Sequence, residues 1–128
     1  MEASTQDHLR QFIKERKFAA AAWEQRGLNP SRSTVCDRME GLLNDMAEKL
    51  LAMPTTNYSP RACERAIGSS LASISSVDFD TEEREFICDE AARLGRIVNA
   101  KISNTLNRWL YGIVLGTLIN LFRGPAKS

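Results

Sequence analysis

The sequence predicts an all-α protein, folded as a compact antiparallel bundle of about five helices. Apolar residues recur three and four positions apart in every segment, whereas no segment shows sustained apolar–polar alternation or contains an Asn-Gly or Asp-Gly turn. The connections between the periodic segments are short, which makes neighbouring helices antiparallel. With 128 residues, 43% hydrophobic composition and a formal net charge of +1, the chain fits a single domain spanning residues 1–128.

Boundary residues define the first two predicted helices. The first begins after Ser4 and continues until Gly27 stops it. The second begins at Asn29-Pro30, an N-cap residue followed by a first-turn proline, and Pro54 closes it. Its apolar residues follow the helical period and are Val35, Met39, Leu42, Leu43, Met46, Leu50 and Met53.

The next two helices begin at similar signals. Ser59-Pro60 repeats the cap and first-turn proline for a third helix that contains Cys63, Ile67 and Leu71. Asp80 is the predicted N-cap of the fourth helix, and Glu83 stands at its third position, where the helix dipole favours an acid.

The last predicted helix starts near Ser103 or Asn104 and has no polar face from Leu110 onward. A helix that is apolar all round must be covered, so we expect it in the core or at an interface. Gly112 and Gly116 share one face, where a neighbouring helix can approach closely. The residues predicted for this core or interface helix are Trp109, Gly112, Ile113 and Gly116.

The longest uncharged run covers residues 109–122. As a helix it would be about 21 Å long, whereas the hydrocarbon core of a bilayer is about 30 Å thick. The sequence therefore predicts no transmembrane span.

Charge is distributed unevenly along the chain. Residues 77–90 contain seven carboxylates and one cation, whereas residues 91–128 contain six cations and no acid. The plainer interpretation of the acidic run is a solvated first turn matched to the helix dipole, and the alternative is a local surface for a basic partner. The residues predicted to bind a partner are Asp78, Asp80, Glu82, Glu83, Glu85 and Asp89. The basic residues lack the dense clusters and aromatic interleaving of a nucleic-acid groove, so we expect no nucleic-acid partner.

Metal chemistry is a weaker interpretation of the same segment. Glu82, Glu85 and Asp89 are spaced by three and four on one helical face and could hold a divalent ion. Metal sites in helical bundles draw ligands from several helices, however, and the single histidine is the distant His8. We therefore predict no metal site.

The cysteines and the missing motifs favour a protein without catalysis. Cys36, Cys63 and Cys88 are an odd number, at spacings that fit neither a zinc site nor a disulfide framework. No P-loop, dinucleotide fingerprint, nucleophile elbow or zinc-protease motif occurs. We predict no catalytic residue and no cofactor, and the free cysteines together with the absence of a secretory signal favour a cytoplasmic location.

Two strings carry a resemblance to a known family. Asp80-Thr81-Glu82-Glu83-Arg84-Glu85 and, twenty residues on, Leu106-Asn107-Arg108-Trp109-Leu110-Tyr111-Gly112 resemble the bacterial domain-of-unknown-function family 4844. The resemblance covers roughly residues 5–112. It implies a small helical protein without an assigned reaction, and it implies a fold rather than a function.

The leading functional hypothesis is a non-enzymatic cytosolic binding protein of the bacterial immunity kind. It would neutralise a toxin by occluding the toxin's active site with the acidic segment. Two alternatives stay open. One is a homo-oligomer or adaptor that assembles through the apolar C-terminal helix, and the other is a carboxylate-dependent, metal-binding enzyme that uses Glu82, Glu85 and Asp89.

Overall fold

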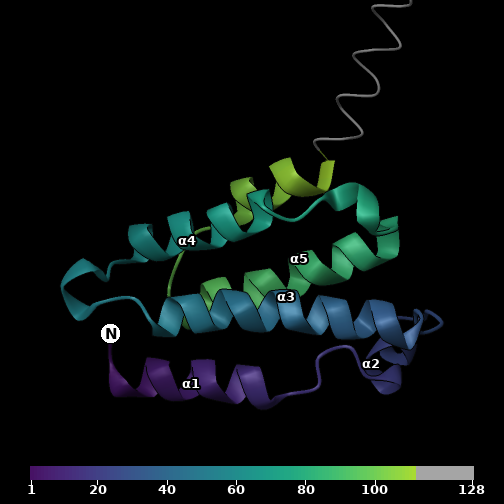
Figure 1. The fold of residues 1–128 in the computed structure, drawn as a ribbon, viewed down its shortest axis with the longest axis horizontal. Helices are drawn as coiled ribbons and strands as arrows, with labels where there is room; N and C mark the ends of the chain where they lie inside the picture. The colour runs from purple at the N-terminus through teal and green to yellow at the C-terminus, as the bar shows by residue number, and fades with distance from the viewer. Residues whose placement is uncertain (112–128) are drawn as a thin grey trace, which may run out of the picture.

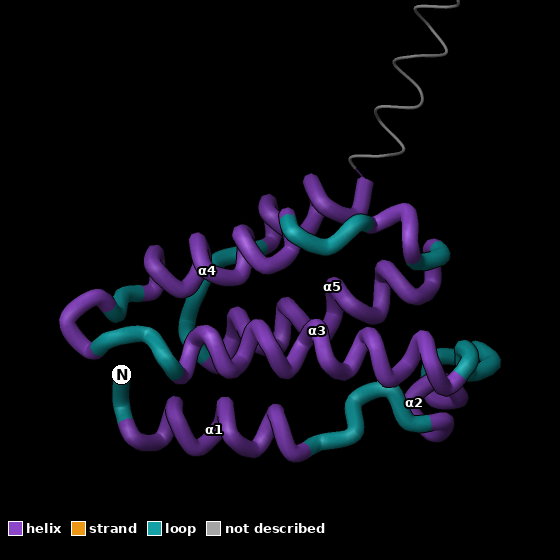
Figure 2. Tube along the Cα trace, viewed as in Figure 1, coloured by secondary structure: helices purple, strands orange, loops and turns teal. Residues whose placement is uncertain are grey.

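The computed structural model describes residues 1–111, and all regular structure within them is helical (Figure 2). The elements in chain order are α1 (Ala3–Lys14), α2 (Ala20–Gln25), α3 (Ser33–Leu51), η1 (Thr55–Asn57), α4 (Pro60–Ala72), η2 (Ser76–Asp78) and α5 (Thr81–Ile97). Residues 103–111 form one further helical segment. The predicted all-α class is therefore confirmed.

The long helices form the antiparallel bundle that the short connections predicted. The chain runs along α1, returns along α3, and then alternates direction through α4, α5 and residues 103–111 (Figure 1). The central helix is α3, which packs against α1, α4 and α5. As a consequence, α4 and residues 103–111 run in the same direction on one side of the bundle.

The hydrophobic core lies between the helices and is continuous. Its largest fully buried side chains are Trp23, Phe12, Leu9, Met39, Leu43, Met46, Leu50, Ile67, Leu71, Ile87, Leu94 and Val98. Phe86 stands edge-on to both Phe18 and Trp23, with ring centroids 4.7 and 4.9 Å apart. In the last helical segment Leu106 is buried and Trp109 is only half-buried, so the described core is centred on the earlier helices.

Three predicted helix boundaries are confirmed. Gly27 follows α2 in the left-handed conformation, with a φ of 74°. Ser59 caps α4 by accepting a hydrogen bond from the backbone N–H of Ala62. Asp80 and Glu83 form a full capping box at the start of α5, in which each side chain accepts a hydrogen bond from the other residue's backbone N–H.

The predicted helix start at Asn29-Pro30 is wrong. Helix α3 begins at Ser33 instead, and its N-cap residue makes no side-chain hydrogen bond. The preceding segment is tied to α5, because the Ser31 hydroxyl donates a hydrogen bond to the Glu83 carboxylate at 2.5 Å. A tertiary contact thus outweighs the local helix-start signal.

The predicted first helix is in fact two helices, α1 and α2. The break centres on Lys17, whose buried Nζ donates to the backbone carbonyls of Phe12 (2.6 Å) and Glu15 (3.0 Å). The backbone N–H of Lys17 donates to the carboxylate of Glu40 on α3. The lysine therefore satisfies carbonyls at the end of α1 that a further helical turn would otherwise satisfy.

The turn after α5 positions the last helical segment. Asn99 adopts a φ of 57°, and the N–H of Ala100 donates to the carbonyl of Gly95 at 2.8 Å, which closes α5 with a left-handed cap. The chain then folds back so closely that a Cβ added to Gly95 would stand 3.0 Å from two side-chain atoms of Ile102. The predicted start of a helix near residue 103 is confirmed.

Candidate binding surfaces

The first half of the acidic segment is part of the fold. The Glu83 side chain is buried, with the residue 8% exposed, and it accepts hydrogen bonds from the Asp80 N–H and the Ser31 hydroxyl. One carboxylate oxygen of Asp80 accepts from the Glu83 N–H at 2.7 Å. Glu83 was predicted to touch a partner, but in the structure it links α5 to the segment before α3.

Two further predicted residues are paired with cations from distant parts of the sequence. Asp78 forms an ion pair with Arg38 of α3 at 2.9 Å, and Asp89 forms one with Arg26 at 2.6 Å. The arginines also lie over aromatic rings, since Arg26 stacks on Phe86 with its guanidinium carbon 4.3 Å from the ring centroid. These pairs reduce the negative charge that the segment presents to solvent.

Glu82 and Glu85 remain exposed and make no hydrogen bond or ion pair with other described residues. Together with Asp80 and Thr81 they line an open hollow at the start of α5. We call Asp80, Glu82 and Glu85 the acidic surface. A second hollow, bordered by Asp80, Glu82 and the segment before α3, adjoins it.

The structure assembles neither a metal site nor an activated thiol from the described residues. Within residues 1–111, no group of three or more His, Cys, Asp or Glu side chains is placed to hold a metal ion. The three cysteines are free thiols. Burial raises the pKa of Cys63, and burial with the nearby charges of Asp89 and Glu85 raises the pKa of Cys88 to about 12. Such thiols stay protonated and are poor nucleophiles near neutral pH.

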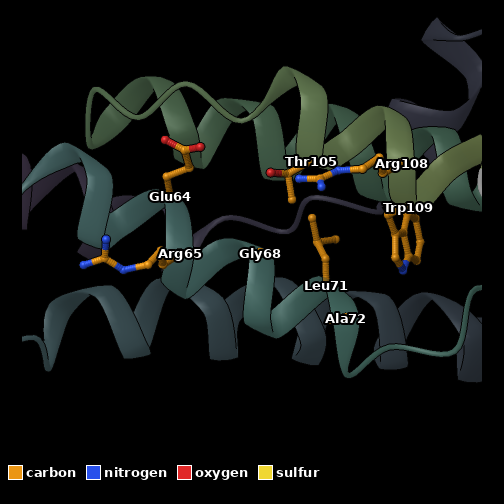
Figure 3. A pocket seen from close by; sticks show the side chains of 8 residues that line it. All are labelled: Glu64, Arg65, Gly68, Leu71, Ala72, Thr105, Arg108 and Trp109. Carbon is orange, nitrogen blue, oxygen red and sulfur yellow. The ribbon is translucent and has the colours of Figure 1, made fainter.

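A second surface lies between α4 and residues 103–111. It is a groove of about 450 Å³, and its lining residues are Glu64, Arg65, Gly68, Leu71, Ala72, Thr105, Arg108 and Trp109 (Figure 3). We call it the α4 groove. Leu71 and Trp109 project toward each other at one end, and Glu64 lies at the other end. The groove therefore combines an apolar end with charged groups on its rim.

Local contacts fix the shape of the α4 groove. The indole Nε1 of Trp109 donates to the carbonyl of Ile74 at 3.2 Å, which ties the last helical segment to the end of α4. At Gly68 an added Cβ would stand 3.4 Å from the Thr105 methyl group, so the two helices come close there. The sequence predicted an interface role for Trp109 but not for the α4 residues, and a glycine inside α4 was the available signal.

The other residues predicted for the C-terminal interface, Gly112, Ile113 and Gly116, lie outside the described residues. No helix within residues 1–111 is both long and apolar enough to cross a membrane.

Comparison with known proteins places the chain in a family. The family described as Domain of unknown function (DUF4844) matches residues 1–114. The chain belongs to the DUF4844 family. The resemblance predicted from the two short strings is thus confirmed, and the match extends slightly beyond the residues that the strings suggested.

A solved structure shares the fold of this DUF4844 chain. It is the crystal structure of a DUF3571 family protein from Acinetobacter baumannii AYE, with a TM-score of 0.81 and 19% sequence identity. The match covers 91% of this chain and 95% of that chain. At this identity the similarity concerns the fold alone. No curated protein matches the chain in sequence.

Proposed function

We propose that this DUF4844 protein is a non-enzymatic binding protein whose acidic surface recognises a basic protein partner. The observation that supports the proposal is the difference in pairing along the acidic segment. Asp78 and Asp89 are neutralised by arginines of the same chain, whereas Glu82 and Glu85 are exposed and unpaired among the described residues. Exposed charge of one sign steers a partner of opposite charge toward the surface.

The acidic surface also stands on a rigid support. The capping box fixes the first turn of α5, and the Ser31–Glu83 hydrogen bond holds that turn against the segment before α3. A surface that is ordered before binding loses little conformational entropy when a partner docks. The geometry therefore favours recognition by a preformed surface over folding on binding.

In its more specific form, the proposal is that this protein acts as a bacterial immunity protein. In that role the partner is a toxin with a basic active site, and the acidic surface covers it. Electrostatic steering supports such a role because it accelerates association, and an inhibitor of a toxin must capture its target quickly.

The test compares a charge-reversed variant with a matched control. The double variant Glu82→Lys/Glu85→Lys reverses the acidic surface and leaves Glu83 and its hydrogen bonds intact. The control Asp45→Lys/Glu48→Lys makes the same change in charge at exposed positions of α3. Each protein is immobilised and exposed to lysate of the native cell and to the purified product of the adjacent reading frame.

The proposal predicts a basic protein that binds the wild type and the control and binds the Glu82→Lys/Glu85→Lys variant at least about tenfold more weakly at low salt. When each protein is co-expressed with the toxic partner, the wild type and the control should protect the cell, and the Glu82→Lys/Glu85→Lys variant should protect it less. Equal binding by all three proteins, or no bound basic protein, would contradict a partner-binding role for the acidic surface.

A further inference from the structure

Two ion pairs flank the acidic surface. Asp78, just before it in the sequence, is paired with Arg38, and Asp89, one helical turn beyond it, is paired with Arg26. We propose that the two arginines are internal competitors of a basic partner: when the partner binds, both pairs open and the acidic surface gains both aspartates. This inference rests on the proposed function, because it concerns the regulation of the same surface.

Both aspartates are within reach of a partner. The Asp89 side chain is 64% exposed and the Asp78 side chain is 42% exposed, in contrast to the buried carboxylate of Glu83. An ion pair between partly exposed groups changes an equilibrium by up to about fivefold. A cation of the partner can therefore replace the internal arginine at a small cost.

The two arginines have a second support that does not depend on the aspartates. The guanidinium carbon of Arg26 lies 4.3 Å from the ring centroid of Phe86, and that of Arg38 lies 5.1 Å from the ring centroid of Phe79. Both rings are buried in the core. A cation within about 6 Å of an aromatic centroid is attracted to the ring. Each arginine therefore keeps a favourable position after its carboxylate has moved to the partner.

The internal pairs use only part of what an arginine can offer. Among the described residues, each pair consists of one guanidinium nitrogen and one carboxylate oxygen, 2.6 Å apart for Arg26–Asp89 and 2.9 Å apart for Arg38–Asp78. The Nε of Arg26 is buried, and no described group accepts its hydrogen bond. A bidentate arginine–carboxylate pair is stronger than such a single contact. A partner arginine can thus bind either aspartate better than the internal one does.

Arg93 shows how a structural arginine of the same chain differs. Its Nε bonds to Glu90 at 2.8 Å and its Nη1 to Glu15 at 2.7 Å, so that it joins α5 to the end of α1. The Glu90 side chain is only 15% exposed. A partner would have to break two contacts, one of them to a largely buried carboxylate. The pairs at the acidic surface lack both features and are suited to exchange.

The exchange favours a partner rich in arginine. The guanidinium groups already seated on the two aspartates show which chemistry these carboxylates accept. Opening both pairs adds two carboxylates to the three of the acidic surface. A partner with a single cation gains little from opening them, whereas one with several arginines can use all five. The internal arginines therefore raise the specificity for strongly basic partners at some cost in affinity.

The test measures the binding of a fluorescent octaarginine peptide to the full chain by anisotropy, at about 0.1 M salt, where charges more than about 10 Å apart are screened. Arg26→Met/Arg38→Met removes both competitors and should bind the peptide about five- to twenty-five-fold more tightly than the wild type. The control Arg10→Met/Arg61→Met removes the same charge at exposed positions of α1 and α4 and frees Asp7. It should bind within about twofold of the wild type.

A further variant identifies the source of the gain. Adding Asp78→Asn/Asp89→Asn to Arg26→Met/Arg38→Met should cancel the gain, because the released carboxylates produce it. Circular dichroism checks the fold, and Arg38→Met alone, at an exposed position, should still tighten binding by up to about fivefold. Arginine variants that bind no more tightly than the control overturn the inference, and so does a gain that persists without the two aspartates.

The variant Glu82→Lys/Glu85→Lys separates this inference from the proposed function. If it leaves the binding of octaarginine unchanged, or if the wild type does not bind the peptide, the acidic surface itself does not recognise basic partners and both proposals are overturned. If it weakens binding while the arginine variants behave like the control, the acidic surface stands and only the internal competition is wrong.

Discussion

The acidic surface and the α4 groove are held in place in different ways. At the acidic surface the Glu83 side chain accepts hydrogen bonds from the Asp80 N–H and the Ser31 hydroxyl, while Glu82 and Glu85 have no partner among the described residues. At the groove the left-handed turn at Asn99 sets the path of the last helical segment, and the Trp109 indole ties that segment to the Ile74 carbonyl. The sequence shows how many charged side chains a segment contains. The fold determines which of those side chains are exposed and unpaired, and therefore able to contact a partner.

Two buried thiols lie on the helices that carry these regions. Burial, with the nearby charges of Asp89 and Glu85, raises the pKa of Cys88 on α5 to about 12, and burial raises the pKa of Cys63 on α4. Because only the thiolate reacts, alkylation of Cys88 at pH 8 should be about a thousandfold slower than that of an unperturbed cysteine. The half-buried Cys36 should react first.

Mass spectrometry of peptides after timed alkylation gives these rates. The rate at Cys88 should rise about tenfold per pH unit, since its raised pKa leaves the thiol protonated throughout the accessible range. Rapid alkylation of Cys88 in the folded protein would mean that the acidic surface opens more readily than its contacts indicate.

Substitutions at two neighbouring positions of the acidic segment compare a buried, hydrogen-bonded carboxylate with an exposed one. Glu83→Ala should lower the free energy of unfolding by about 2–4 kcal/mol, because it removes half of the capping box and leaves the Ser31 hydroxyl without its acceptor. Glu82→Ala, one residue earlier and exposed, should change it by about 0.5 kcal/mol or less. Urea unfolding measures both values, and equal losses at the two positions would remove the distinction.

Two glycines test how the backbone positions the α4 groove. Gly95→Ala should lower the free energy of unfolding by about 1 kcal/mol, because the new methyl group crowds Ile102 at 3.0 Å. Gly41→Ala in α3 is the matched control, since an added Cβ there meets nothing within 4 Å. It should raise the free energy by up to about 1 kcal/mol through helix propensity. A stabilising Gly95→Ala would show that the last helical segment is not held by this contact.

The smallest expected effect on stability concerns an ion pair at the edge of the acidic surface. Arg38→Ala should cost about 1 kcal/mol or less, because Arg38 and Asp78 are both partly exposed. It should also release the Asp78 carboxylate and increase the salt dependence of binding to a basic partner. Arg10→Ala, which breaks the exposed pair with Asp7, is the control for stability and should leave binding unchanged.

Much of the fold could be predicted because its signals are local. Ser59 and Asp80 are capping residues that act within one helical turn, and the structure uses both as predicted. Lys17 could not be recognised as a helix breaker, because its effect depends on burial against α3 and on Glu40. Local propensity cannot report a contact that forms only after the helices pack.

The candidate site was less predictable for the same reason. Asp89 is paired with Arg26, 63 residues earlier, and Asp78 with Arg38, 40 residues earlier. Neither pair has a sequence signature, so the acidic segment looked more strongly charged in the sequence than it is on the surface. The α4 groove was missed because it is a property of two helices that meet, and its signals in the sequence were limited to Trp109 and the glycine inside α4, Gly68.

The left-handed turn at Asn99 also divides the chain into two unequal parts. Helices α1 to α5 precede it and contain nearly all of the buried core, whereas the residues after the turn add Ile102 and Leu106 to that core. A substitution on the exposed side of residues 103–111 therefore changes the wall of the α4 groove and leaves the packing among α1 to α5 untouched.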